Sequence, residues 1–297
     1  MRLASGQSFF AVALALNLSV GGGTGVAASP PIGTVMAKGS FRLDNVTIRG
    51  NATLFEGATI ETADTGSSME LSSGARVTLS PESKGRFFGD HVVLERGQGR
   101  LDKTAGFHLE ARGLTIQPET GNATGRVLLA SSTRVQVAAL TGSFRVLNAR
   151  GMVVAKLPPG LTLAFEPQIS SAPTKLMGRL QVKNGHYLLT DETTNVTVEL
   201  FGPGLAKEVG HRIEVTGSLD PTVTPVSDAS EFIRVTSIKT VPGSGAAPAG
   251  AAGGSSGAVI SGTAIAIIGG VAAAAVVGGL AAVGGLPGQG TSAVVSR

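Results

Sequence analysis

The feature that most constrains the fold of this chain is an alternation of apolar and polar residues within residues 57–101. Hydrophobic side chains occupy every second position at Met69 and Leu71 and again at Val77 and Leu79, with Ser73-Gly74 between the two runs. A period of two residues places one face of a strand in a core, and a Ser-Gly pair between two such runs is a turn signal. Residues 69–79 are therefore predicted to form a half-buried β-hairpin.

A second strand pair is predicted directly after the first. Residues 84–88 and 91–94 form two short runs with Gly89-Asp90 between them. This dipeptide is typical of a tight turn, because Gly and Asp tolerate the positive φ angles that such turns need. A second hairpin is therefore expected at residues 84–94.

Similar short runs continue through the rest of the first half of the chain. They lie at residues 41–43, 46–48, 52–55, 58–60, 107–109, 114–116, 126–129, 135–137, 144–147, 152–155 and 161–165. No window carries the apolar i, i+3, i+4, i+7 series of a helix, so this module is predicted to be all-β. The strand spacing fits a sandwich, and the closer spacing at residues 42–60 also fits a β-roll. The absence of a strict repeat argues against a regular solenoid.

The same stretch resembles a known family. Thr62, the run TGSSMEL at residues 65–71 and the run SGARVTLSPES at residues 73–83 resemble the central motif of the FecR domain family, and TGSFRV, VLNARGMVV and LPPG within residues 137–161 continue the likeness. The resemblance covers residues 33–170. It implies the envelope-side sensing part of a sigma-factor regulator. Such regulators carry a cytoplasmic anti-sigma segment before their membrane span, and residues 1–28 do not fit one, so sigma-factor signalling is an alternative rather than the main expectation.

A second β-module is predicted at residues 177–241, after a proline-containing linker at residues 166–176. Its strand-like runs lie at residues 178–182, 186–189, 196–201, 212–215 and 232–238, and residues 205–209 form a single helical turn. Five short strands with one helical turn before the fourth, and the phrase GHRIEVTG at residues 210–217, resemble a small bacterial OB-fold domain. The expected fold class is thus all-β, with a FecR-like sandwich or roll followed by a five-stranded OB-like barrel.

The two ends of the chain predict export and anchoring. Residues 1–28 have the order of a secretory signal peptide, with Arg2 first, an apolar run at residues 9–16 and Val26-Ala27-Ala28 as a cleavage site. Residues 242–257 form a tether rich in Gly, Ala and Ser, and residues 258–286 are long and apolar enough for a transmembrane helix, followed by a short tail at residues 287–297. Small residues in that helix would permit helix–helix self-association. The expected location is the bacterial periplasm or cell surface.

Charge and cysteine content narrow the class of partner. Residues 33–170 hold 15 Lys/Arg and 12 Asp/Glu, a net +3, while residues 175–241 hold 7 and 8, a net −1. Neither is the concentrated positive charge of a nucleic-acid-binding module, so nucleic acid is not the expected partner. The absence of cysteine favours a bacterial envelope protein without disulfides. An envelope protein or a polysaccharide is the expected partner.

No catalytic or cofactor-binding pattern is recognised. No phosphate-binding glycine loop follows a predicted strand, so no cofactor is expected. The four histidines are far apart in sequence, and Asp90 and His91 would point to opposite faces if one strand ran through them, so no metal site is expected. A hydrolase that uses Asp90, His91 and Ser67 is a third hypothesis, for which no residue pattern predicts convergence.

The expected function is therefore non-catalytic binding, scaffolding or sensing. The alternative is carbohydrate or nucleic-acid binding by the OB-like module. Tyr187, with Lys183 and Arg212 nearby, is the candidate ligand-binding set, because OB-like domains use aromatic side chains on an open face. Phe201 and Phe232 fall within apolar runs and are expected to pack in the core.

Overall fold

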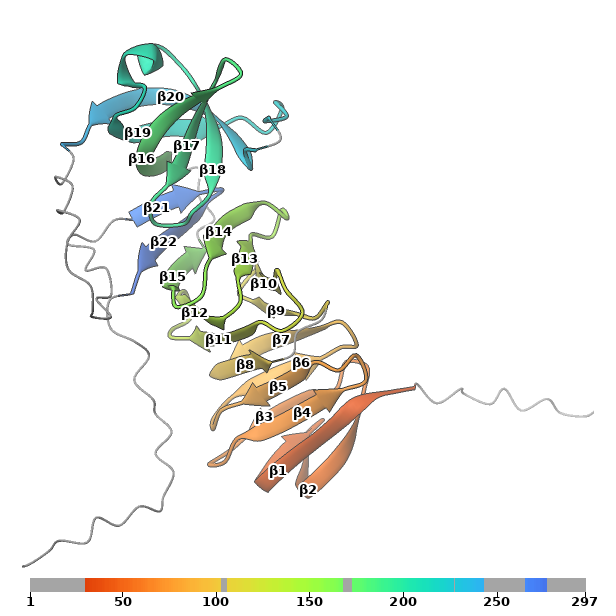
Figure 1. Cartoon of the computed structure of the whole chain (residues 1–297). Coiled ribbons are helices and arrows are strands. Elements are labelled where there is room, and N and C mark those ends of the chain that lie inside the picture. The colour runs from red at the N-terminus through yellow and green to blue at the C-terminus, as the bar shows by residue number, and fades with distance from the viewer. Residues whose placement is uncertain (1–29, 103–105, 168–172, 227, 243–264, 277–297) are drawn as a thin grey trace, which may run out of the picture.

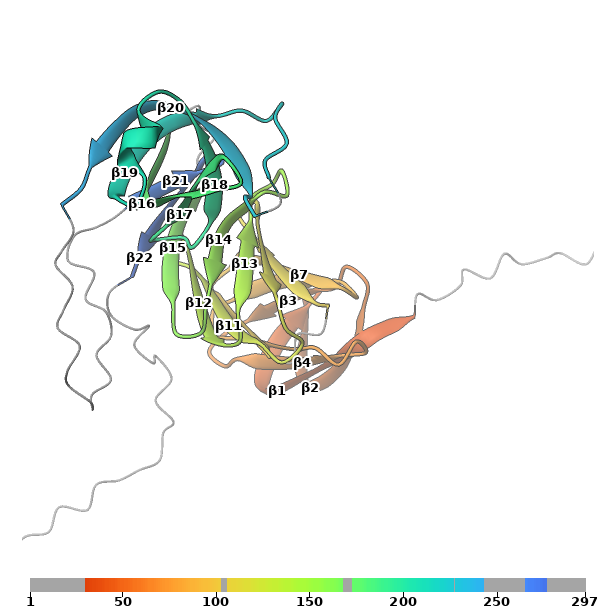
Figure 2. The same ribbon diagram turned by 45° about the horizontal axis from the view of Figure 1, so that its top comes forward.

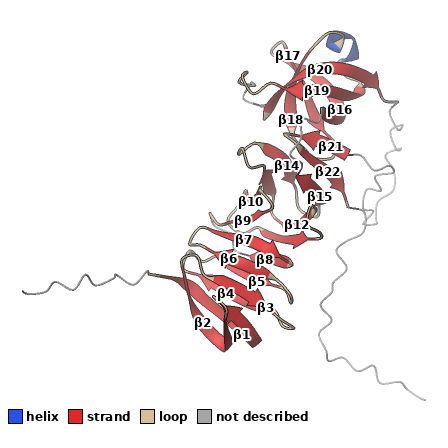
Figure 3. Ribbon diagram, turned by 180° about the vertical axis from the view of Figure 1, so that it is seen from behind, coloured by secondary structure: helices blue, strands red, loops and turns tan. Residues whose placement is uncertain are grey.

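The computed structural model describes residues 30–102, 106–167, 173–226, 228–242 and 265–276, and shows an elongated stack of strands that ends in a barrel (Figure 1). In these residues the regular elements are strands, apart from one short 3-10 helix (Figure 3). The prediction of an all-β chain is confirmed.

The first fifteen strands form the body that we call the roll. They are β1 Pro31–Leu43, β2 Val46–Phe55, β3 Thr59–Thr62, β4 Ser67–Leu71, β5 Arg76–Leu79, β6 Lys84–Phe87, β7 His91–Arg96, β8 Gln98–Asp102, β9 His108–Ala111, β10 Leu114–Pro118, β11 Thr124–Leu129, β12 Val135–Thr141, β13 Phe144–Leu147, β14 Val153–Leu157 and β15 Thr162–Pro167.

The roll has two layers, and the chain passes back and forth between them. Layer A has the order β4, β5, β8, β11, β12, β15, and layer B has the order β3, β6, β7, β9, β10, β13, β14. The first strand belongs to both, because β1 pairs with β4 through residues 33–37 and with β3 through residues 41–43. Of the two architectures that the spacing left open, the repeated crossing between layers is that of a roll.

Both predicted hairpins are present. Met69 pairs with Val77 in the β4–β5 hairpin, and Arg86 pairs with Val93 in the β6–β7 hairpin. The turn between β6 and β7 differs in one respect from its prediction, because neither Gly89 nor Asp90 has a positive φ angle. A backbone hydrogen bond of 2.9 Å from the Phe88 amide to the His91 carbonyl closes this turn without one.

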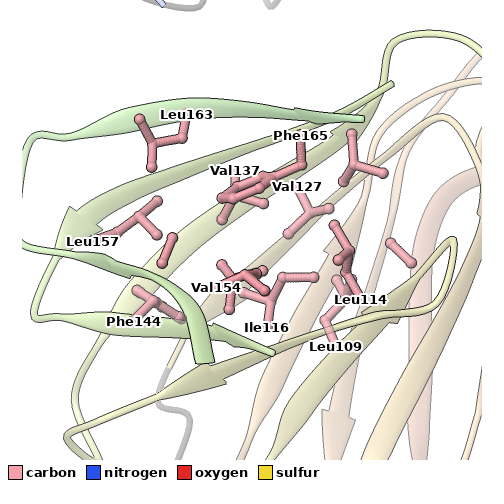
Figure 4. Packing of buried hydrophobic residues seen from close by; sticks show 14 of the residues in the cluster. Leu109, Leu114, Ile116, Val127, Val137, Phe144, Val154, Leu157, Leu163 and Phe165 are labelled. Carbon is pink, nitrogen blue, oxygen red and sulfur yellow. The ribbon is translucent and has the colours of Figure 1, made fainter. Parts of the chain in front are cut away.

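The core lies between the two layers (Figure 4). Inward residues of layer A and layer B face each other across it, and most of them are completely buried. The labelled examples are Val127, Val137, Leu163 and Phe165 from layer A and Leu109, Leu114, Ile116, Phe144, Val154 and Leu157 from layer B. Burying a side chain of this size stabilises the fold by about 1.5–3 kcal/mol, so the alternation read from the sequence is the main source of stability.

The second module is a closed five-stranded barrel. Its elements are β16 Thr174–Lys183, β17 His186–Asp191, β18 Thr197–Phe201, η1 Leu205–Glu208, β19 Arg212–Leu219 and β20 Glu231–Thr240. Successive antiparallel pairs join β16 to β17 and β17 to β18, a parallel pair joins β18 to β20, and antiparallel pairs join β20 to β19 and β19 back to β16. The five predicted strands and the helical turn before the fourth are all present.

A C-terminal hairpin replaces part of the predicted transmembrane helix. Residues 265–275 form β21 Ile265–Ile268 and β22 Val271–Ala275, joined by Gly269-Gly270, whose φ angles are +56° and +79°. The prediction of a helix over residues 258–286 is therefore wrong for this stretch. β-branched residues on both sides of a Gly-Gly pair favour a two-residue hairpin. In the described residues no helix has the length and apolar character needed to cross a membrane.

This hairpin lies between the roll and the barrel (Figure 2). β22 pairs with β15 along five residues, and β21 meets β16 at Ile267 and Lys175. Layer A is thereby extended to the barrel by strands from the far end of the sequence. Outside the described residues lie the predicted signal peptide, the tether from residue 243 onward and the tail. Residues 258–264 and 277–286 of the predicted helix also lie outside them. Self-association of a helix formed by those residues stays a prediction, without the Gly269-Gly270 pair, which forms a turn.

Candidate ligand-binding face of the barrel

The barrel presents an aromatic pair on its outer surface. β18 and β20 run parallel, and their register places Phe201 opposite Arg234 and Glu199 opposite Phe232. Because alternate residues of a strand point to opposite faces, Val198 and Leu200 enter the barrel core while Phe201 points outward. The Phe201 and Phe232 rings are stacked with centroids 6.1 Å apart, and Phe201 is 58% exposed.

Arg234 completes this group, which we call the aromatic platform (Phe201, Phe232 and Arg234). Its guanidinium carbon lies 5.7 Å from the centroid of the Phe201 ring and 5.9 Å from that of Phe232, within the range of a cation–π contact. Arg234 Nε donates a hydrogen bond of 2.7 Å to Asp220 Oδ2. Hydrogen bonds from Thr222 and then from Arg234 lower the pKa of Asp220, so its carboxylate is charged beside the rings.

The exposure of the platform corrects the expectation that both phenylalanines pack in the core. The missed signal is local and polar: Glu199 stands two residues before Phe201, and Arg234 two residues after Phe232. In a strand, residues two apart share a face, so each phenylalanine shares the outward face with a charged residue. The apolar runs that contain both rings concealed this alternation.

The structure places the predicted ligand set in three different surroundings. Tyr187 lies on β17 opposite Val182 and Leu200, where its half-buried ring packs against the core. Lys183 ends β16, and its ammonium pairs with the carboxylate of Asp228. The two residues are thus on neighbouring strands, but the charge of Lys183 is directed to the loop between β19 and β20.

Arg212 lies apart from both. It lies on β19 opposite Arg179, in the interior of β16, and its guanidinium binds the carboxylate of Glu192 through hydrogen bonds of 2.9 Å and 2.7 Å. The hydrogen bond to Glu192 raises the pKa of Arg212 above its ordinary value. The three residues do not form one cluster, and a role for them in ligand binding stays a prediction.

Glu199 fixes the surface beside the platform. Its side chain is almost fully buried, with Oε1 2.7 Å from Nδ1 of His186 and Oε2 accepting the amide of Val226 at 2.9 Å. The Val226 contact holds the loop that begins with Asp220 against the outer face of β18. The platform therefore stands on strands whose neighbouring loop is itself hydrogen-bonded in place.

The candidate hydrolase residues are not assembled. Asp90 lies in the turn before β7, so no strand runs through both residues and the condition for opposite faces is not met; its carboxylate lies 2.7 Å from His91 Nδ1. Ser67 lies on β4 in the other layer, buried and with no hydrogen-bond partner for its hydroxyl among the described residues. The structure therefore brings Asp90 and His91 together and leaves Ser67 in the other layer.

The parallel pairing of β7 and β9 adds a feature that the sequence did not predict. It sets His91 opposite His108, with stacked rings 5.1 Å apart, and Phe88 stacks on His91 at 4.4 Å. Parallel stacked rings direct their nitrogens sideways rather than toward a common point. In the described part of the chain no three side chains of a metal-binding kind come together.

A hollow of about 870 Å³ lies on the surface of the roll, where the chain crosses between the two layers. Glu61 is central to it and contacts Arg96 at 2.8 Å and Arg42 at 3.9 Å. Asp64 and Glu82 also line the hollow, so its two arginines stand among three carboxylates. The hollow therefore offers paired ions, whereas the platform offers an exposed apolar surface beside a cation and an anion.

Comparison with known proteins identifies no family for this chain. No family model matches the chain, and no curated protein matches it. Two crystal structures described as a "putative anti-sigma factor" from Parabacteroides distasonis are similar over 36% of this chain and 54% of that chain, with 17% and 16% identity and a TM-score of 0.31 for each. The match thus spans about half the length of those proteins.

Proposed function

We propose that this chain is a non-catalytic protein exported to the bacterial envelope, in which a FecR-like roll carries a barrel that binds a carbohydrate chain through the aromatic platform. One observation carries the binding role: Phe201 is 58% exposed, yet its ring is held in a defined position by Phe232 and Arg234. Scattered exposed apolar residues are common on protein surfaces, but a stacked pair backed by a fixed guanidinium is a pre-organised surface.

The chemistry of the platform favours a sugar over a nucleic acid. A pyranose ring has an apolar C–H face that packs on an aromatic ring, and its hydroxyl groups need both donors and acceptors. Arg234 supplies donors and Asp220 supplies acceptors at the edge of the rings. A nucleic acid would require positive charge along its backbone, and residues 175–241 carry a net −1. Barrels of this strand order bind oligosaccharides as well as oligonucleotides.

The binding role is tested with the full chain on an array of bacterial polysaccharide fragments. Substituting Phe201→Ala should weaken binding by about five- to 150-fold, since stacking on one aromatic ring is worth about 1–3 kcal/mol. Val209→Ala is the matched control, because it truncates another exposed hydrophobic side chain of the barrel, 41% exposed, outside the platform. Equal binding by the two variants, or no binding by the parent chain, would remove the proposal. If Phe201→Ala instead loses binding to oligonucleotides and keeps binding to polysaccharides, the platform is assigned to nucleic acid.

Export is tested separately by cell fractionation with protease treatment of intact and permeabilised cells. The proposal rests on the signal-like order of residues 1–28. A product confined to the cytosol would refute export while leaving the platform intact. Sigma-factor signalling, implied by the motif at residues 62–83, stays the alternative, and an interaction of this chain with a sigma regulator would favour it.

A further inference from the structure

The roll has one protected end and one open end. At the protected end, β22 covers β15 of layer A, and the barrel covers β14 of layer B, where the Lys156 amide donates to the Thr194 carbonyl at 2.7 Å. At the other end stands β2, which among the described residues pairs only with β1 (Figure 1). The outer backbone groups of a strand that is ten residues long are therefore left without a strand partner.

This edge has few of the features that prevent pairing with another strand. Exposed edges are normally blocked by charges, prolines or a short length. β2 contains no proline, and Arg49 is its one charged residue. The end is also apolar, because Met36, Val46 and Phe55 belong to it and are 40%, 63% and 46% exposed. Three of the seven exposed large hydrophobic residues in the described chain are thus concentrated at one edge.

We infer that β2 is a dimerisation edge and that its occupant is a second copy of this chain, joined end to end. β2 bends at Gly50, with a φ angle of +86°, so its residues 51–54 continue layer A and its residues 46–49 continue layer B. A two-fold axis perpendicular to the layers sets each half of β2 antiparallel to the same half of the second copy. Both layers then continue across the junction at once.

Self-pairing also fits the charge on the edge. If the two-fold axis passes near the middle of each half of β2, the exposed residues Thr47 and Thr53 lie near Thr47 and Thr53 of the second molecule. A two-fold centred near residue 48 does not set Arg49 directly against Arg49 of the other copy, so no like-charge pair opposes the contact. Because the opposite end of each molecule is already covered, the association closes as a dimer and does not extend to a filament.

The first test measures mass in solution for the full chain by sedimentation between about 1 and 100 µM, the range in which a modest interface is populated. The parent chain should be a dimer, and Thr53→Lys should weaken it at least tenfold by placing like charges across the axis. Thr141→Lys is the matched control, an exposed threonine on β12 that pairs with Thr124 of β11, in the part of layer A that does not adjoin β2. A monomer throughout this range, or equal dimerisation of the two variants, overturns the inference.

The second test identifies the edge directly. The chain has no cysteine, so a single introduced thiol reports one position without interference. Oxidation should convert Thr53→Cys to a covalent dimer, and Thr141→Cys should remain monomeric on a denaturing gel. Cross-linking of Thr141→Cys without Thr53→Cys would place the contact elsewhere and refute the β2 edge. Both variants change exposed side chains, so thermal melting serves to confirm that each is folded.

Discussion

Glu231 should make this protein less stable as the pH rises toward neutrality. It begins β20, is only 2% exposed, and neither carboxylate oxygen has a hydrogen-bond partner among the described residues. A Cβ atom on Gly269 would lie 3.3 Å from Glu231 Oε1, so the carboxyl group stands against the turn of the C-terminal hairpin. Burial raises the pKa of Glu231 from its ordinary 4.5 to about 7, and the positive charge of Arg150 opposes this only in part.

The magnitude follows from proton linkage. Below pH 4.5 the carboxyl group is protonated in both the folded and the unfolded chain, so its burial costs least. Between pH 4.5 and about 7 the unfolded chain releases its proton while the folded chain retains it, so the free energy of unfolding falls as the pH rises. Above about pH 7 both states are ionised and the loss is complete. The full loss is about 3 kcal/mol.

Glu231→Gln isolates this effect because glutamine has nearly the same shape and carries no charge. Urea unfolding of parent and variant should give similar free energies near pH 5. At pH 8 the variant should be the more stable by about 2–3 kcal/mol. Glu214→Gln controls for loss of a carboxylate, since Glu214 forms a partly exposed ion pair with Lys175 at 3.3 Å. Identical pH profiles for parent and Glu231→Gln would refute the assignment of the raised pKa to burial.

Two further predictions concern single elements. Ala273→Asp should destabilise the chain by about 3 kcal/mol or more, because Ala273 on β22 is only 2% exposed and the new carboxylate would be buried. Ala272→Asp, on the outward face of the same strand, should change stability little. Equal effects of the two substitutions in thermal melts would refute the hairpin. Asp191→Ala should cost about 2–4 kcal/mol in urea unfolding, because its buried carboxylate accepts hydrogen bonds of 2.9 Å from the Met177 amide and 2.8 Å from the Thr194 amide. A loss below about 1 kcal/mol would show that these bonds contribute little net stability.

Local patterns predicted most of the strands and hairpins. The alternation at Met69, Leu71, Val77 and Leu79 depends only on neighbours in sequence, and all four side chains lie in the core. Turn residues such as Ser73-Gly74 and Gly89-Asp90 predicted where the neighbouring strands end. The five strands of the barrel were predicted for the same reason. What local patterns cannot give is the pairing of distant strands, which depends on the whole fold.

The site features that were missed depend on such distant pairing. Phe201 meets Phe232 and Arg234 because β18 and β20 are parallel neighbours, although some thirty residues separate them in sequence. The stack of His91 on His108 likewise follows from the pairing of β7 with β9. Neither contact has a spacing signature, since the chain between the two paired strands, which itself contains other strands, can have any length. Exposed alternation beside a charged residue is the part of the signal that a sequence can show.

The error at the C-terminus has a different cause. Mean hydropathy treats a long apolar stretch as a membrane helix, but it carries no information about what else could bury that stretch. Here β15 offers an unpaired edge, and the β-branched residues Ile267, Ile268 and Val271 around a Gly-Gly turn suit a hairpin. The alternation of Val271 and Ala273 toward the core was the available signal.

The covering of β15 by β22 also sets the order in which this protein is completed. Leu163 and Ala275 are partners although roughly 110 residues separate them in sequence. A ribosome delivers the chain from its N-terminus, so the roll and the whole barrel, β1 to β20, are synthesised before β22, the strand that completes layer A. Until β22 is made, the outer edge of β15 has unpaired backbone groups that could pair with another polypeptide. A chaperone that binds nascent chains would be expected to bind at this edge.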